Sequence, residues 1–242
     1  MKICLAQARP ISGDVQANII NHKKLIALAA PFNPDLIVFP ELSVTGYEPK
    51  LANDLAMRLE DDRLDDFQRL SDQMKMTIAC GLPLQVVEGI LISLIIFRPQ
   101  VPRSFYSKKY LHLDEEPYFI RGSQGVDSMD MDKNIALAIC YEISIEEHAD
   151  DAAGRGATIY LASADKTTRG IKEAIERLAT IGKKYSMTVL LANCAGTCDG
   201  GVCGGKSSIW NKQGVLIGQL EQREQGILMI DTKNDSIIKK WL

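Results

Sequence analysis

Three side chains that together could form a catalytic set stand at the ends of apolar, strand-like runs. Cys140 closes the run IALAI, Glu41 follows the run LIVF and Pro40, and Lys108 follows SFYS. A thiol can attack a carbonyl carbon, a carboxylate can take its proton, and an ammonium can stabilise the oxyanion that forms. Each residue alone also has an ordinary explanation, as a buried cysteine, a capping or surface glutamate, and a solvated lysine.

The residues after Cys140 read as the start of a helix, so this thiol is expected at a strand-to-helix turn that faces a cleft. Helix N–H groups and Lys108 then favour its thiolate, and we expect it to be the fastest-reacting thiol of the chain. Cysteine hydrolases commonly pair the thiol with histidine, but His22, His112 and His148 have no evident place in such a pair. A Glu–Lys–Cys set is the other way to activate a thiol.

The elements that must position these residues alternate between apolar strands and amphipathic helices, which predicts an α/β fold. Strands are predicted at Lys2–Ala8, Leu36–Phe39, Thr77–Gly81, Ile90–Phe97, Ser104–Ser107, Ile135–Ile139, Thr158–Ala162, Thr188–Ala192, Ser207–Trp210, Val215–Ile217 and Gly226–Ile230. Helices are predicted at Val15–Ala30, Leu51–Met74, Ser144–Gly154 and Thr168–Tyr185. Some strands are joined by helices and others by short turns, so we expect two packed mixed sheets with helices outside, in a single domain spanning residues 1–242.

Composition favours a protein that acts on small molecules. The chain has 242 residues, 46% of them hydrophobic, and a formal net charge of −3. Its lysines and arginines are scattered, which argues against nucleic acid as a partner. No apolar stretch is long enough to span a membrane, and the N-terminus reads as a strand and not as a signal peptide. We therefore expect a cytoplasmic protein whose six cysteines are reduced.

Three segments carry a resemblance to a known family. FPELSVTGY, YSKKYLHLDEEPYF and ICYE resemble the signature blocks of the nitrilase, or carbon–nitrogen hydrolase, superfamily, and looser similarity runs from Gln7 to GGKSSIW. The resemblance implies an α-β-β-α sandwich that pairs across subunits, which together with an apolar C-terminal segment predicts a homodimer. It also implies Glu41 as base, Lys108 as the lysine of a Tyr-x-Lys pattern, and Cys140 as nucleophile.

Two features of the blocks leave questions open. Many members have a second glutamate in the loop after the lysine; Glu115 resembles it, with Glu116 as the competitor. Many members also read Cys-Tyr-Asp followed soon by arginine, whereas this chain has Glu142 and then Ile143. That departure leaves the catalytic set intact and affects the substrate pocket. The pocket is expected to be lined by the loops after Tyr47, around 114–118 and around 165–169.

The resemblance implies hydrolysis of a small amide or an N-carbamoyl compound through a thioester. Lys108 and the backbone N–H of Tyr141 would hold the oxyanion, and no metal or cofactor is needed. Nitrile hydrolysis on the same site is an alternative, as is a non-catalytic or nucleotide-binding protein on the same scaffold. The lipoprotein acyltransferase branch needs membrane helices and the ammonia-supplying branch a fused synthetase domain, so both are disfavoured.

Two local patterns suggest other sites and are discounted. GGVCGGKS, from Gly200 to Ser207, fits the phosphate-loop pattern, but the residues after it read as a strand and turn instead of the helix that holds phosphates. Cys194, Cys198 and Cys203 lack a C-x2-C pair and a nearby fourth ligand, so reduced cysteines beside the pocket are preferred to structural zinc.

Overall fold

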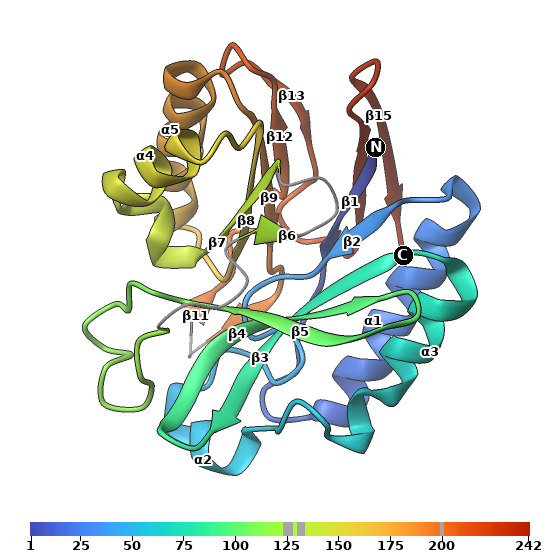
Figure 1. Ribbon diagram of the computed structural model, residues 1–242, viewed down its shortest axis with the longest axis vertical. Coiled ribbons are helices and arrows are strands. Elements are labelled where there is room, and N and C mark those ends of the chain that lie inside the picture. Colours follow the sequence, from blue (N-terminus) through green and yellow to red (C-terminus); the bar gives the residue numbers. More distant parts are fainter. Residues whose placement is uncertain (123–127, 130–133, 199–200) are drawn as a thin grey trace.

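The computed structural model describes residues 1–122, 128–129, 134–198 and 201–242, except for the side chains of 128–129 and 198. The chain forms four layers, with helices α1 and α3 outside one sheet and α4 and α5 outside a second sheet that packs against it (Figure 1). The helices are α1 (Val15–Ala29), α2 (Ala52–Leu55), α3 (Asp65–Met74), α4 (Glu146–Gly154) and α5 (Gly170–Tyr185). The predicted α-β-β-α sandwich is confirmed.

The first sheet has seven strands in the order β15-β14-β1-β2-β3-β4-β5. They are β1 (Lys2–Gln7), β2 (Leu36–Val38), β3 (Thr77–Val86), β4 (Gly89–Arg98), β5 (Val101–Ser107), β14 (Gly226–Asp231) and β15 (Ser236–Trp241). The pairs β1–β2 and β2–β3 are parallel and the others antiparallel, so the sheet is mixed as expected.

The second sheet has the order β13-β12-β9-β8-β7-β6. Its strands are β6 (Ser128–Met129), β7 (Ile135–Ile139), β8 (Ile159–Ala164), β9 (Thr188–Asn193), β12 (Ser208–Trp210) and β13 (Leu216–Gln219). The three central strands, β7, β8 and β9, run parallel, and their apolar runs are buried on both faces. A small hairpin of β10 (Thr197–Cys198) and β11 (Gly201–Val202) stands apart from both sheets.

Alternation along each strand divides the core into three layers. In β1, Ile3 and Leu5 face the second sheet, whereas Cys4 and Ala6 face the helices α1 and α3. This is the two-residue period of a strand buried on both sides. A third cluster lies under α4 and α5 on the outer face of the second sheet.

Gln7, at the end of β1, ties the two sheets together. Its side-chain oxygen accepts from the Ser207 N–H at 2.9 Å, and its amide nitrogen donates to the carbonyls of Glu221 and Glu224 at 2.7 and 2.8 Å. A buried amide that satisfies both ends in this way fixes the strand register locally. The first strand is therefore connected directly to the last third of the chain.

The single helix predicted over Leu51–Met74 is wrong. The structure has the short helix α2, a bridge residue at Met57, a turn, a 3-10 helix at Asp62–Leu64, and then α3. The buried Met57 pairs as an isolated parallel bridge with Leu84, because β2 is only three residues long and leaves the edge of β3 uncovered there. The backbone N–H of Met57 donates to the Pro83 carbonyl at 3.0 Å, which removes it from any helix.

Strands β3 and β15 also differ from the sequence expectation. β3 continues five residues past Gly81, through Pro83, whose missing N–H is tolerated in this antiparallel pairing with β4. The C-terminal segment, expected only as an apolar contact surface, forms β15 and pairs with β14 along its whole length. Trp241 is nevertheless 47% exposed.

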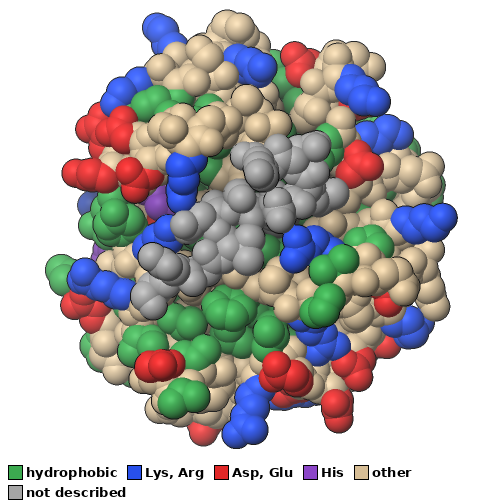
Figure 2. Space-filling view, in the orientation of Figure 1, with side chains coloured by type: hydrophobic (Ala, Val, Ile, Leu, Met, Phe, Trp, Pro, Cys, Tyr) green, Lys and Arg blue, Asp and Glu red, His purple; other side chains and the backbone are tan. Residues whose placement is uncertain are grey.

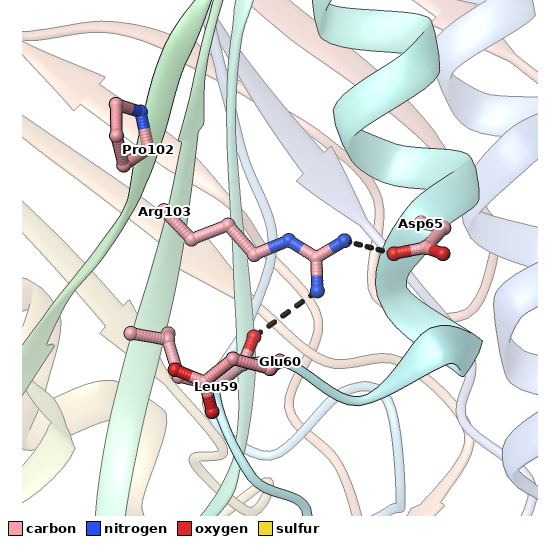
Figure 3. A pocket seen from close by; sticks show the side chains of 5 residues that line it. All are labelled: Leu59, Glu60, Asp65, Pro102 and Arg103. Atoms are coloured by element: carbon pink, nitrogen blue, oxygen red, sulfur yellow. Dashed lines mark hydrogen bonds and ion pairs between the residues drawn. The ribbon is translucent and has the colours of Figure 1, made fainter.

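One arginine of β5 connects the first sheet to α3 and to the segment that precedes α3. Arg103 of β5 donates to the carbonyl oxygens of Leu59 and Asp61 at 3.1 and 3.2 Å. It also forms an ion pair with Asp65 of α3, and Figure 3 shows this ion pair and the bond to Leu59. This cation therefore has structural partners. On the face shown in Figure 2, acidic and basic side chains are interspersed, with no large region of one sign.

Candidate active site

Glu41 is placed by a turn that crosses β3 at very close range. The residue follows β2 and the buried Phe39, and it is itself 1% exposed. A Cβ atom on Gly81 of β3 would lie 2.4 Å from the Pro40 carbonyl oxygen and 2.5 Å from the Leu42 nitrogen. The Gly81 carbonyl also accepts from the Val44 N–H at 3.0 Å. Only glycine lets the turn lie this close to the sheet.

Cys140 begins a tight 3-10 turn, Cys140–Ser144, directly after β7. Its φ of +44° is uncommon for a residue with a side chain and is typical of functional turns. The carboxylate of Glu142 holds this turn, since it accepts from the backbone N–H of Ile139 at 2.7 Å and that of Lys109 at 2.6 Å. Tyr106 donates to the same carboxylate at 2.8 Å. Glu142 thus connects the cysteine turn to the lysine segment.

Lys108 lies at the end of β5 and joins two buried carboxylates. Its ammonium is 2.7 Å from Glu41 Oε1 and 2.6 Å from Glu115 Oε1. All three side chains are essentially inaccessible to solvent. The remaining Glu41 oxygen, Oε2, accepts from the Asp165 N–H at 3.2 Å, and the Cys140 thiol donates a hydrogen bond to the Glu41 carboxylate. The structure therefore brings the three sequence-predicted residues together.

The second glutamate of this cluster is Glu115 and not Glu116. Beyond its contact with Lys108, Glu115 accepts from the Tyr47 hydroxyl at 2.8 Å and from the His112 N–H at 2.8 Å. Glu116 lies outside the cluster, where Arg121 donates to it at 2.6 Å. Tyr47 was not predicted as part of the site, although it stands within the first signature block.

Burial and neighbouring charges shift the pKa values of Glu41, Lys108 and Cys140. Burial raises the pKa of Glu41, although the neighbouring ammonium of Lys108 opposes this effect. Burial would lower the pKa of Lys108, but the charges of Glu41, Cys140 and Glu115 raise it overall. Lys108 is therefore a permanent cation between carboxylates.

The expectation that Cys140 is stabilised as a thiolate is wrong for the free protein. Burial first, and then the Glu41 carboxylate, raise the pKa of the Cys140 thiol to about 12. The cations Lys166 and Lys108 act in the opposite direction without reversing the shift. The thiol is therefore protonated at neutral pH, and a nucleophilic role would require a base beside it.

A cavity of about 320 Å³ opens above Cys140. The described residues that line it are Tyr47, His112, Asp114, Glu115, Cys140, Tyr141, Asp165, Lys166, Thr167, Gly170 and Gly201. The loops predicted around 114–118 and 165–169 do contribute. The loop after Tyr47, which was also predicted, contributes none of these residues, and Tyr47 itself lines the cavity instead. The volume is near the lower end of the range for ligand pockets, which fits a small substrate.

The three histidines have other partners. His112 lines the pocket, 2.5 Å from Asp114 Oδ1, with its ring edge-on to that of Tyr141. His148 lies 3.0 Å from the Tyr106 hydroxyl and 2.9 Å from that of Tyr160. His22 packs in the core against Phe39.

The two discounted motifs have structural explanations. Ser207 and Ser208 lead into β12, so the described part of the phosphate-loop pattern is followed by a strand, as predicted; Gly200 lies outside the described residues. Cys194 and Cys203 are buried, and the side chain of Cys198 is not among those described. Within the described ranges, no three His, Cys, Asp or Glu side chains are grouped as metal ligands. No helix of the described residues is long and apolar enough to cross a bilayer.

Known structures with this fold include an amidase from Nesterenkonia sp. AN1. A cysteine-to-alanine variant of that amidase in complex with butyramide superposes with a TM-score of 0.85 at 22% identity, over 97% of this chain and 92% of the other. A further structure of an amidase from Nesterenkonia sp. gives a TM-score of 0.85 at 23% identity, over 96% of this chain and 89% of the other. At this identity the similarity shows the fold.

Curated relatives of similar sequence are larger proteins. The glutamine-dependent NAD(+) synthetase of Acinetobacter baylyi is 28% identical over 227 residues, which cover 90% of this chain and 41% of the relative. The enzyme of the same name from Thermotoga maritima is 23% identical, over 99% of this chain and 43% of the relative. The chain thus spans less than half the length of these relatives.

A family model settles the relationship that the motifs and the fold indicate. The model for carbon-nitrogen hydrolase matches residues 2–239, nearly the whole chain. The chain therefore belongs to the carbon–nitrogen hydrolase family of the nitrilase superfamily.

Proposed function

We propose that the protein hydrolyses the carbon–nitrogen bond of a small primary amide, with Cys140 as nucleophile. The observation that carries this proposal is the buried contact set of Glu41, Lys108 and Glu115 beside the Cys140 thiol, at the base of a small pocket. Neither core packing nor folding requires an ammonium shared between two buried carboxylates, because burying charges is costly. Such a cluster is typical of a functional site.

In the proposed reaction, Glu41 takes the thiol proton as the sulfur attacks the amide carbonyl carbon. Lys108 and the backbone N–H of Tyr141 stabilise the tetrahedral oxyanion. Glu41 then returns the proton to the leaving nitrogen, so that ammonia departs and a thioester to Cys140 remains. A water molecule, deprotonated by Glu41, attacks the thioester and releases the acid and the free thiol. Glu115 holds Lys108 in place throughout.

An amide is favoured over a nitrile because of what is bound in a relative of the same fold. The Nesterenkonia amidase is described with butyramide, a short linear amide. A cavity of about 320 Å³ suits a molecule of that size. An N-carbamoyl compound is a close chemical neighbour and belongs in the same assay.

Glutamine is the second candidate substrate. The curated relatives are named as glutamine-dependent synthetases, and the side chain of glutamine ends in a primary amide. On sequence alone, an ammonia-supplying role was disfavoured because this chain has no fused synthetase domain. Since the chain matches part of proteins that are named as glutamine-dependent synthetases, that role is retained as a candidate.

The experiment is a measurement of ammonia release by the purified protein. Butyramide, glutamine, an N-carbamoyl amino acid and butyronitrile form the panel. Cys140→Ala should abolish release, whereas Cys4→Ala, which alters a buried cysteine in the helix-side core, should retain it. Glu41→Gln should also abolish release, because an amide cannot accept the thiol proton. Ammonia release by Cys140→Ala at the wild-type rate would refute the proposal.

A further inference from the structure

Lys166 is a cation of the pocket that the proposed chemistry does not use. It follows β8 and Asp165, whose N–H donates to Glu41, and it lines the cavity above Cys140. In the described part of the chain, its ammonium has no hydrogen-bond or ion-pair partner. Arg103, by contrast, is bound to Asp65 and to the Leu59 carbonyl, as Figure 3 shows, and to the Asp61 carbonyl as well.

The backbone of Lys166 is fixed by hydrogen bonds, although its side-chain ammonium has no partner among the described residues. Its N–H donates to Asn193 Oδ1 at 2.7 Å, and its carbonyl accepts from Asn193 Nδ2 at 3.2 Å and from the Gly204 N–H at 2.7 Å. Asn193 is fully buried at the end of β9. The Cα of Lys166 is thus a rigid origin from which the ammonium reaches into the pocket, as a positioned recognition residue requires.

The carboxylates that line the same pocket already have partners. Glu115 is bound by Lys108 and Tyr47, and Asp114 lies 2.5 Å from the His112 ring. Asp165 accepts from the Cys203 thiol at 3.4 Å. An anionic ligand can therefore pair with the ammonium of Lys166. A cationic ligand would find only carboxylates that already have an ion-pair or hydrogen-bond partner, so the pocket favours an anion. Helix α5, which begins at the lining residue Gly170, adds the positive end of its dipole at the same mouth.

We propose that Lys166 is a specificity-determining residue that binds a substrate carboxylate, so that the protein prefers amides whose far end is anionic. The inference rests on the proposed function and narrows it to a substrate class. Monoamides of short dicarboxylic acids belong to this class, and so do amino acids that carry a side-chain amide. The ammonium of Lys166 also lowers the pKa of the Cys140 thiol, which places its charge near the reacting sulfur.

Succinamate and butyramide form a matched pair for the test, because a carboxylate replaces the terminal methyl group. Wild type should have the higher kcat/KM for succinamate. Lys166→Met should reduce the succinamate-to-butyramide ratio of kcat/KM by about 10- to 100-fold, as expected for a hydrogen bond to a charged group. The ratio is the readout because loss of a cation near the thiol slows both substrates. Lys212→Met, which removes an exposed lysine in the turn after β12, should leave the ratio unchanged.

Binding gives a second readout that does not need turnover. Titration of succinamate into Cys140→Ala and into Cys140→Ala/Lys166→Met should show weaker binding to the double variant by a similar factor. Equal affinities, or a preference for the cationic 3-aminopropanamide, would overturn the inference. If butyramide is hydrolysed in a Cys140-dependent way and Lys166→Met leaves the succinamate-to-butyramide ratio of kcat/KM unchanged, only this inference fails. If wild type releases ammonia from no amide, the proposed function fails with it.

Discussion

Gly81 offers a test of how Glu41, the proposed catalytic base, is positioned. In Gly81→Ala the new methyl carbon would lie 2.4 Å from the Pro40 carbonyl oxygen and 2.9 Å from the Glu41 carbonyl carbon. Ordinary contact begins at 3.4 Å, so the turn that carries Glu41 has to move by about 1 Å away from β3. The opposing atoms are backbone atoms on both sides, and neither a rotamer change nor a flexible side chain can relieve the overlap.

A displacement of this size has a predictable effect on rate. Misplacing a catalytic group by about 1 Å costs on the order of 100-fold in rate, and overpacking costs about 1–3 kcal/mol of stability. We expect Gly81→Ala to lose about two orders of magnitude in kcat/KM for ammonia release while it still folds at the assay temperature. Circular dichroism melting separates the loss of rate from the loss of fold.

The matched control is Gly154→Ala at the end of α4, where an added Cβ meets no atom within 4 Å. This variant should keep the wild-type rate and gain slightly in stability, since alanine is the better helix residue. A Gly81→Ala protein that equalled the Gly154→Ala protein in both rate and melting temperature would refute the reasoning about the close approach.

Four further predictions concern charges and assembly. Lys108→Ala should lose at least about 10²–10³-fold in kcat, the effect of removing one oxyanion donor, whereas Lys109→Ala should stay near wild type; the reverse result would shift the assignment by one residue. Burial raises the pKa of Glu41 above its ordinary 4.5, and the base must be ionised to accept the thiol proton. The value of kcat/KM should therefore fall on acidification with an apparent pKa above 4.5, and an apparent pKa below 4.5 would contradict this. Burial lowers the pKa of His22 from 6.5 to about 4, so between these pH values the unfolded chain binds a proton that the folded chain does not. The free energy of unfolding, measured with urea, should therefore drop by about 3 kcal/mol as the pH falls from 6.5 to 4. The drop should be smaller in His22→Gln. A homodimer is expected from the open edge of β15 and the exposed Trp241, and light scattering that finds a monomer at micromolar concentration would exclude it.

The parts of the site that could be predicted from sequence are those that end a buried strand. β7 has the predicted bounds Ile135–Ile139 because its apolar run is short and sharply limited. Cys140, Glu41 and Lys108 follow such runs, so their meeting at one edge of the layered fold could be anticipated. Glu115 was preferred to Glu116 through family resemblance alone, and its burial supplies the physical reason.

The parts that could not be predicted depend on how distant segments pack. The break after α2 exists because Met57 pairs with β3, which no local pattern of helix formers reveals. The requirement for Gly81 comes from a turn forty residues earlier in the chain, seen only when the two are in contact. Lys166 reads as one more surface lysine until Asn193 is seen to anchor its backbone.

The tie between Gln7 and Ser207 has a consequence for biosynthesis. These residues are 200 positions apart, and β1 is flanked by β14, which lies almost at the end of the chain. A ribosome that has made neither Ser207 nor β14 holds a β1 strand with one edge unpaired and its glutamine unsatisfied. Contacts this remote in sequence close late and slowly, so the nascent chain should complete its first sheet only after β14 has emerged.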